Sequence, residues 1–128
     1  DVELTNLVGV YSRISNMPSV HAVLFTAKPI GGELKCQEGE TIAVQWFDFD
    51  NIPNPLSAGH ERRISDALSG KSGFAVSQEF TIPALTEKIS RKDLIELRDG
   101  SGLSRQAFYL KLMQDAVIEE KVELGGYE

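Results

Sequence analysis

Residues 40–47 read Glu-Thr-Ile-Ala-Val-Gln-Trp-Phe, and the tripeptide Asn51-Ile52-Pro53 follows after a short acidic run. Apolar side chains alternate with small or polar ones here, so Ile42, Val44 and Trp46 fall on one side of an extended chain. The prolines that follow disfavour regular structure beyond this point. The stretch therefore predicts a β-strand over residues 41–49 that ends in a turn.

Two more strands are predicted before this stretch. Residues 7–14 and 20–27 are rich in branched and aromatic side chains, and a turn containing Asn and Pro separates them. Strict alternation places Val8 and Val10 on one face of the first strand and Tyr11 on the other. The pair predicts a β-hairpin.

The segments after residue 53 alternate between helix and strand signals. The prediction is a helix capped by Ser57 that ends near residue 68, a strand over residues 74–80, a helix over residues 91–98 capped by Ser90, and a helix capped by Ser104 that ends near residue 120. The chain is therefore expected to be α/β, with a first unit over residues 1–73 and a small helical unit over residues 74–128.

The composition of the 128 residues excludes several classes of protein. Hydrophobic residues make up 41% and charged residues 25%, which is ordinary for a globular domain and excludes a disordered chain. No apolar stretch approaches the roughly 18 residues of a transmembrane helix, so no membrane partner is expected. The single cysteine, Cys36, excludes an intrachain disulfide and favours a reducing, cytoplasmic location. The net charge of −6 argues against non-specific binding of nucleic acid.

The order of motifs from Gly31 to Leu68 resembles the second half of a Nudix (MutT-like) hydrolase domain. The string over residues 40–47, followed by Asn51-Ile52-Pro53 and a helix, is similar to a strand, exit and C-terminal helix of that family. The opening Leu-Val-Gly-Val-Tyr over residues 7–11 resembles the strand after the Nudix box, so the resemblance covers roughly residues 4–70. It implies a partial Nudix-type mixed sheet flanked by helices.

The Nudix box itself is absent from these residues. The box requires an Arg-Glu dipeptide, which occurs nowhere here, and the only Glu-Glu pair, Glu119-Glu120, lacks its partners. Two expectations follow from the resemblance. Either the box lies upstream of Asp1, as the start directly in a strand suggests, or the family member is inactive.

Three acidic residues are then candidates for a metal site with Mg²⁺ or Mn²⁺. The resemblance implies that a late acidic loop residue completes the metal shell or acts as a base, and hard divalent cations prefer carboxylate oxygens. Glu40 and Glu38 are the catalytic candidates, and Glu33 and Glu40 are the metal candidates. The alternative for each is a solvated acidic loop.

Trp46, Phe47 and Arg62 are the candidates for binding a nucleotide-type substrate. An aromatic ring lines a pocket or stacks on a base, and Arg62 lies near a helix start, where phosphate binds. The alternatives are a buried core position for each aromatic residue and a solvated first turn for Arg62.

The last 50 residues depart from a plain Nudix enzyme. Residues 88–111 hold six basic and three acidic side chains, and a Gly-containing turn joins the two predicted helices. The pattern is helix-turn-helix-like and resembles Nudix-related regulators in which a winged helix follows a non-hydrolytic Nudix domain. In that case Arg105, Gln106 and Tyr109 contact DNA. The alternative is a helical tail that packs on the sheet or on a partner subunit.

The first functional expectation is a Nudix-family hydrolase. It cleaves a nucleoside diphosphate linked to another moiety through attack of a metal-activated water on phosphorus, and without an upstream box it is inactive. The second is a transcriptional regulator that binds an ADP-ribose-like effector and DNA. A third is an assembly module with neither activity. A homodimer is left open in each case.

Overall fold

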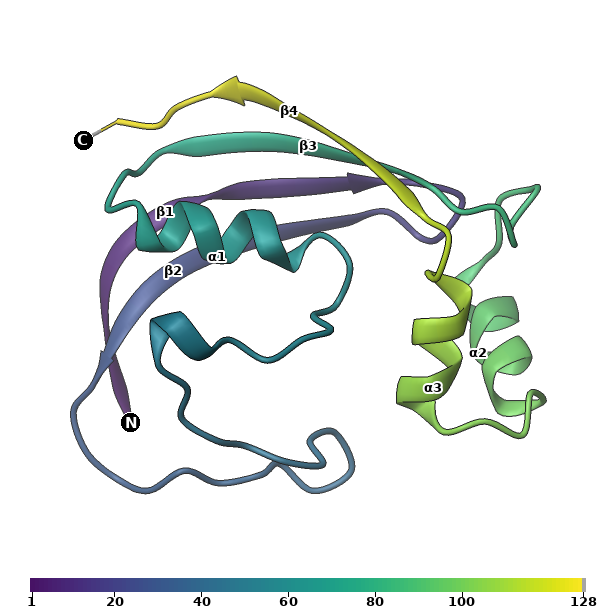
Figure 1. Ribbon diagram of the computed structural model, residues 1–128, viewed down its shortest axis with the longest axis horizontal. Helices are drawn as coiled ribbons and strands as arrows, with labels where there is room; N and C mark the ends of the chain where they lie inside the picture. The colour runs from purple at the N-terminus through teal and green to yellow at the C-terminus, as the bar shows by residue number, and fades with distance from the viewer. Residues whose placement is uncertain (128) are drawn as a thin grey trace.

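The structure is a computed structural model that describes residues 1–127. It shows a mixed α/β protein in which a four-stranded sheet has the strand order β2-β1-β3-β4 (Figure 1). The elements are β1 (Val2–Ile14), β2 (Val20–Pro29), the 3-10 turn η1 (Phe49–Asn51), α1 (His60–Leu68), β3 (Phe74–Thr81), α2 (Arg91–Asp99), α3 (Arg105–Leu112) and β4 (Val117–Leu124).

The sheet contains both strand orientations. β1 pairs antiparallel with β2, which confirms the predicted hairpin, although both strands are longer than expected. β1 also pairs parallel with β3, and β3 pairs antiparallel with β4. The parallel neighbours β1 and β3 are joined through β2, the long connection after it and α1, as a parallel pair requires.

Irregular pairing in β1 changes which side chains face the core. The register with β2 shifts between Leu7 and Gly9, so one residue is inserted and the alternation breaks. Val8 and Tyr11 are both fully buried, while Val10 is 40% exposed. The prediction that Val8 and Val10 share a face is therefore wrong, because a bulge reverses the alternation between them.

Gly9 lets β1 and β3 approach closely at this bulge. A Cβ atom on Gly9 would lie 2.5 Å from the carbonyl oxygen of Phe74 and 2.7 Å from its Cβ. No larger residue fits without moving one of the strands, so the central pair of the sheet depends on glycine here.

Helix α1 covers one face of the sheet (Figure 1). A first apolar cluster lies on this side, with Ala67 of α1 packed against it; its buried members are Val8, Tyr11, Phe74 and Val76. The helix begins two residues later than predicted, with Gly59 as its N-cap at φ 85° and no side-chain cap. Ser57 instead accepts a bond from the His60 amide through its carbonyl oxygen.

Helices α2 and α3 form a second apolar cluster at one end of the sheet. Its buried members are Met17, Phe80, Ile82, Leu94, Phe108 and Leu112. The predicted caps are confirmed, because Ser90 Oγ accepts from the Asp93 amide and Ser104 Oγ accepts from the Ala107 amide, each at 3.1 Å. The last helix, however, ends at Leu112 rather than near residue 120, and the chain continues as β4.

The predicted strand over residues 41–49 is absent from the structure. Segment 30–59, the connection between β2 and α1, holds local turns and η1, with the Glu40 and Thr41 amides both bonded to the Gln37 carbonyl oxygen. Ile42 is 89% exposed. A strand requires a neighbouring strand for its backbone groups, and none lies beside this segment in the described residues, so alternation alone does not form one.

The expected boundary at residue 73 separates strands of a single sheet, because β1 and β2 precede it and β3 and β4 follow it. Residues 74–128 contribute β3 and β4 in addition to two helices, so this part of the chain is not wholly helical. Among residues 1–127, none of the helices combines the length and the apolar character that a bilayer crossing requires.

Candidate functional site

A pocket of about 370 Å³ lies where the β1–β2 hairpin meets segment 30–59. Its lining residues come from the start of β1, the end of β2 and the segment after it; they are Asp1, Val2, Pro29, Gly31, Gly32, Glu33, Leu34 and Trp46. Two carboxylates and one indole ring therefore meet in one hollow.

The turn after β2 shapes this pocket. The Ile30 amide donates to the Asp1 carbonyl oxygen at 3.0 Å, which extends the hairpin pairing to the first residue. Gly32 then adopts φ 80°, a conformation that favours glycine, and a Cβ on it would lie 3.7 Å from Asp1 Oδ2. The turn thus folds back against the Asp1 carboxylate and carries Glu33 to the same hollow.

The structure brings some of the sequence candidates together and leaves others apart. Glu33 and Trp46 line the same pocket, although they lie 13 positions apart in the sequence. Glu38 and Glu40 lie in an exposed turn, and Phe47 is 45% exposed outside the pocket lining. Over residues 1–127, no three His, Cys, Asp or Glu side chains are grouped so that they could hold a metal ion.

Chemically, the pocket offers a flat indole ring and two carboxylates. The Trp46 side chain is 68% exposed, so one face of the indole is available for stacking. The carboxylates of Asp1 and Glu33 are hard oxygen donors, and such a pair fits Mg²⁺ or Mn²⁺ when water and phosphate oxygens complete the shell. Asp1 was not identified from the sequence, because only the fold brings the first residue to the turn after β2.

A second, wider hollow of about 550 Å³ lies between α1 and the end of segment 30–59. Its lining is mostly aliphatic and consists of Ile52, Leu56, Glu61, Ile64, Ser65, Leu68 and Ser69. It holds none of the sequence candidates and offers a single carboxylate, so it provides fewer specific contacts than the smaller pocket.

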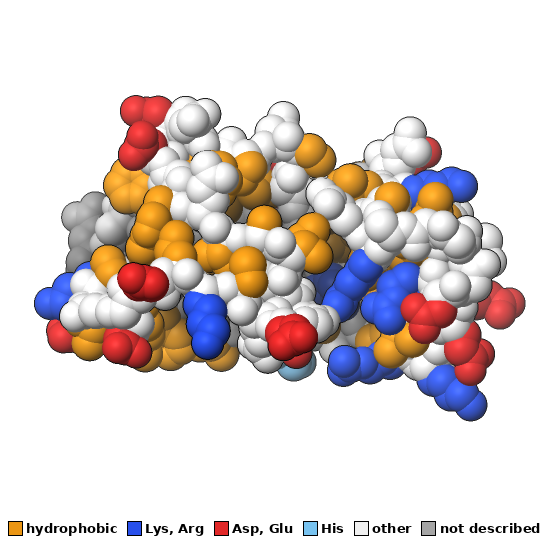
Figure 2. All heavy atoms as spheres, turned by 90° about the horizontal axis from the view of Figure 1, so that it is seen from below, with side chains coloured by type: hydrophobic (Ala, Val, Ile, Leu, Met, Phe, Trp, Pro, Cys, Tyr) orange, Lys and Arg blue, Asp and Glu red, His pale blue; other side chains and the backbone are white. Residues whose placement is uncertain are grey.

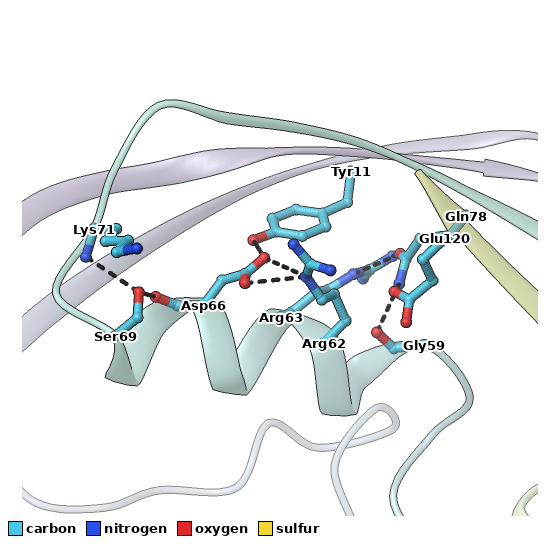
Figure 3. A network of polar contacts seen from close by, with 9 residues as sticks. All are labelled: Tyr11, Gly59, Arg62, Arg63, Asp66, Ser69, Lys71, Gln78 and Glu120. Carbon is cyan, nitrogen blue, oxygen red and sulfur yellow. Dashed lines mark hydrogen bonds and ion pairs between the residues drawn. The ribbon is translucent and has the colours of Figure 1, made fainter. Parts of the chain in front are cut away.

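A buried polar network joins α1 to the sheet, and Figure 3 shows its members pointing toward one another. The Tyr11 hydroxyl donates to Asp66 Oδ2 at 2.7 Å, and Arg62 Nε donates to both carboxylate oxygens of Asp66 at 2.9 and 3.0 Å. Burial, and then the bond to Asp66, raise the pKa of the Tyr11 phenol. The hydrogen bond to Asp66 likewise raises the pKa of Arg62.

Gln78 is the centre of the other half of this network. Its side chain is fully buried and accepts from Arg63 Nε and Nη2 through Oε1. Its Nε2 donates to the Gly59 carbonyl oxygen at 2.9 Å and to Glu120 Oε2 at 2.8 Å. One amide therefore ties together the start of α1, β3 and β4 (Figure 3).

This network changes the interpretation of Arg62. Its guanidinium is ion-paired with Asp66 four residues later and lies 5.9 Å from the centre of the Phe74 ring. Asp66 engages this side chain in the structure, and the phosphate contact of Arg62 stays a prediction. Asp66 and Gln78 were missed in the sequence; the Arg-x-x-x-Asp spacing on a helix was the one available signal.

At the α2–α3 end, the structure separates the three DNA-binding candidates. Arg105 and Gln106 are exposed in the first turn of α3. Tyr109 is half-buried, with its ring edge-on to Phe108 at 5.2 Å between centroids. Tyr109 therefore belongs to the packing of the second cluster rather than to the exposed helix surface.

Comparisons with known proteins identified no relative of this chain. A scan against protein-family models, a search of curated proteins and a search of solved structures each found no match for this chain.

Proposed function

We propose that this chain is the substrate-holding part of a Nudix-type pyrophosphohydrolase that acts on a nucleoside diphosphate linked to another moiety. The observation that supports the proposal is the pocket in which Asp1, Glu33 and Trp46 meet. The indole would stack on the base, and the two carboxylates would hold a divalent cation that neutralises charge on the pyrophosphate.

The division of labour within this proposal follows from the residues present. A bound Mg²⁺ would supply charge neutralisation at phosphorus and an activated water. Asp1 and Glu33 would hold that ion, and Trp46 would stack on the base. The carboxylate-rich box that the resemblance demands is not among these 128 residues, so hydrolysis by the proposed enzyme requires carboxylates from elsewhere.

The test uses Trp46 as an intrinsic probe, because it is the only tryptophan in the chain. ADP-ribose with Mg²⁺ is expected to change the Trp46 fluorescence, and Glu33→Gln should weaken binding about tenfold, the scale of one charge-assisted contact. Glu38→Gln is the matched control, since it removes the same charge from an exposed turn outside the pocket. An unchanged fluorescence up to millimolar ligand would exclude the proposal.

A separate assay addresses catalysis. The 128-residue chain with Mg²⁺ is expected to release no phosphate-containing product from ADP-ribose, because it lacks the box carboxylates. Product release above the rate without protein would show that these residues hold a complete catalytic centre, and would contradict the proposed division of labour.

A second function is favoured by the arrangement of the last elements. The helix pair α2 and α3 is followed by β4, which returns to pair with β3, and this order resembles a winged helix. Arg105 and Gln106 are exposed at the start of α3. Residues 88–111 carry a net charge of +3, which leaves −9 for the rest of the chain. Figure 2 shows Lys and Arg side chains at the α2–α3 end.

For this second candidate we propose a ligand-sensing regulator that reads DNA with α3. Binding through several phosphates should weaken steeply with salt, and Arg105→Ala should reduce affinity for DNA about tenfold. Lys71→Ala removes a charge far along the chain from α3 and is the control. No binding to the DNA upstream of the gene at micromolar protein in low salt would eliminate the regulator.

A further inference from the structure

Arg13 is a half-buried cation that the fold leaves without a counter-ion. It lies near the end of β1, and its Nη2 donates to the Pro18 carbonyl oxygen at 2.9 Å. Its Nε is buried and has no hydrogen-bond partner in the described residues. No Asp or Glu in residues 1–127 forms an ion pair with it within 4.0 Å. A guanidinium in this environment ordinarily has an anionic partner.

The register of the sheet places a second guanidinium beside it. Arg13 is opposite Gln78 in the parallel pairing of β1 with β3, and the Gln78 side chain points to the face that α1 covers. Arg63 of α1 donates both Nε and Nη2 to Gln78 Oε1. The Gln78 amide oxygen therefore accepts from Arg63 and not from Arg13, although Arg13 lies opposite Gln78 in the sheet.

Both side chains keep unused donors. Among the described residues, Nη1 of Arg13 and Nη1 of Arg63 make no hydrogen bond, and neither nitrogen is a buried atom without a partner. Neither Nη1 atom is therefore fully buried with its donors unused. Burial, and then the charge of Arg63, lower the pKa of Arg13, as expected when a second cation lies nearby.

The nearest acidic groups are already engaged by other partners. Asp66 is bonded by Arg62 and Tyr11, and Glu120 accepts from Gln78 Nε2. Glu120 acts on Arg63 at a distance, but it forms no ion pair with it within 4.0 Å in the part of the chain that the structure describes. The cluster therefore retains excess positive charge at Arg13.

We propose that Arg13 and Arg63 together bind a phosphoryl group at the junction between the sheet and the α2–α3 unit. The planar guanidinium fork matches phosphate oxygens, and two such forks favour a dianion over a carboxylate or chloride. This site lies on the face of the sheet covered by α1. It uses none of the residues of the Trp46 pocket, the hollow in which Asp1, Glu33 and Trp46 meet. Figure 2 shows basic side chains gathered where the sheet meets the α2–α3 end.

The test measures binding of inorganic phosphate to the whole chain by calorimetry at constant ionic strength. One phosphate per chain is expected to bind in the millimolar range or tighter, with acetate and chloride failing to compete. Arg13→Met and Arg63→Met should each weaken binding about tenfold or more, as expected for a lost charge-assisted contact. Lys28→Met is the control, because Lys28 is exposed, paired with Glu3 and located at the far end of the hairpin.

Three results would overturn the proposal. They are no binding at 10 mM phosphate (about ten times the expected millimolar constant), equal competition by acetate, and an equal loss of affinity in Lys28→Met. If the methionine variants fail to fold, Arg13→Lys and Arg63→Lys decide. They keep the charge but remove the planar fork, so binding should weaken measurably and unchanged affinity would contradict the site.

The source of the phosphoryl group is determined in the same experiment with a nucleoside monophosphate. Tighter binding than phosphate, lost in Arg13→Met but retained in Trp46→Ala, would identify a nucleotide as the source. Equal affinity for both ligands would identify free phosphate. Either result supports the site, whereas loss in Trp46→Ala alone would assign the nucleotide to the Trp46 pocket and count against it.

Discussion

Two regions of the molecule differ in how deeply they bury large side chains. One is the face of the sheet that α1 covers, and the other is segment 30–59. Under α1, Tyr11 and Gln78 are fully buried, and their polar atoms bond to α1, Gly59 and β4. In segment 30–59, Ile42 and Trp46 are largely exposed, and after Ile30 the bonds between backbone groups are local turns. In Figure 2, hydrophobic side chains also lie open on the surface seen from below. Burial depends on a partner element, and residue type alone does not determine it.

This difference assigns separate roles to the two regions. The network under α1 contributes to stability, because buried polar groups are costly when a partner is removed. Segment 30–59 contributes Glu33 and Trp46 to the pocket, where exposure is needed for a ligand to bind. Substitutions should therefore separate stability from ligand binding.

The largest effect is expected for Asp66→Ala. The change leaves the Tyr11 hydroxyl and the Arg62 guanidinium without their shared acceptor, and the free energy of unfolding should fall by about 2–4 kcal/mol. Urea unfolding measures it, with Asp50→Ala in the exposed turn η1 as the control. A loss of under about 0.5 kcal/mol, the range of ordinary surface changes, would mean that the network does not stabilise the α1 face.

A smaller loss is expected for Gln78→Ala. It removes the amide that joins Arg63, Gly59 and Glu120, and the cost should be about 1–3 kcal/mol. The same urea experiment applies, with Gln106→Ala on the exposed start of α3 as the matched control. Equal effects of the two substitutions would show that burial of Gln78 has no energetic consequence.

A substitution in segment 30–59 should lower the free energy of unfolding less than a substitution on the face of the sheet that α1 covers. Ile42→Ser is expected to alter the free energy of unfolding by less than about 0.5 kcal/mol, because the side chain is exposed. Val8→Ala, at full burial, should cost about 2 kcal/mol. Thermal unfolding of both variants compares the regions directly, and a loss above about 1 kcal/mol for Ile42→Ser would reveal packing of the segment in solution.

The smallest effect concerns His60 at the start of α1. Burial, and then the nearby Arg63, lower the pKa of His60 in the folded state. The unfolded chain therefore binds more protons below about pH 6.5, the ordinary value, and stability should decrease as pH falls from there toward the lowered folded pKa. His60→Gln should flatten this part of the stability profile. If the variant and the parent chain show the same slope of stability against pH, His60 is not the cause of the pH dependence.

Local sequence signals predicted the elements that short-range physics determines. The hairpin, the strand at residues 74–80 and the helices capped by Ser90 and Ser104 are all present. Each depends on alternation, a turn or a cap within a few residues. The end of α3 was predicted too late, because residues 117–124 pair with β3, and this tertiary contact overrides the apolar helical pattern.

The candidate site was only partly predictable. Glu33 and Trp46 carried a chemical signal in the sequence, and the pocket contains both. Asp66 carried only its spacing from Arg62, and Asp1 and Gln78 carried no signal, because their roles depend on residues distant in the sequence or on another element of the fold. Glu38, Glu40 and Phe47 matched the same pattern, yet the structure places them outside the pocket.

By itself, the sequence determined the α/β class, the hairpin, the caps and the types of side chain available for chemistry, because these follow from local periodicity, turn residues and composition. Only the tertiary structure decided which of those side chains meet. The bulge at Leu7–Gly9 turned both Val8 and Tyr11 inward, and the parallel pairing set Arg13 opposite Gln78. Within residues 1–127 no strand lies beside residues 41–48, which therefore have no regular structure. The physical reason is that backbone pairing and burial depend on partners distant in sequence, which no local pattern specifies.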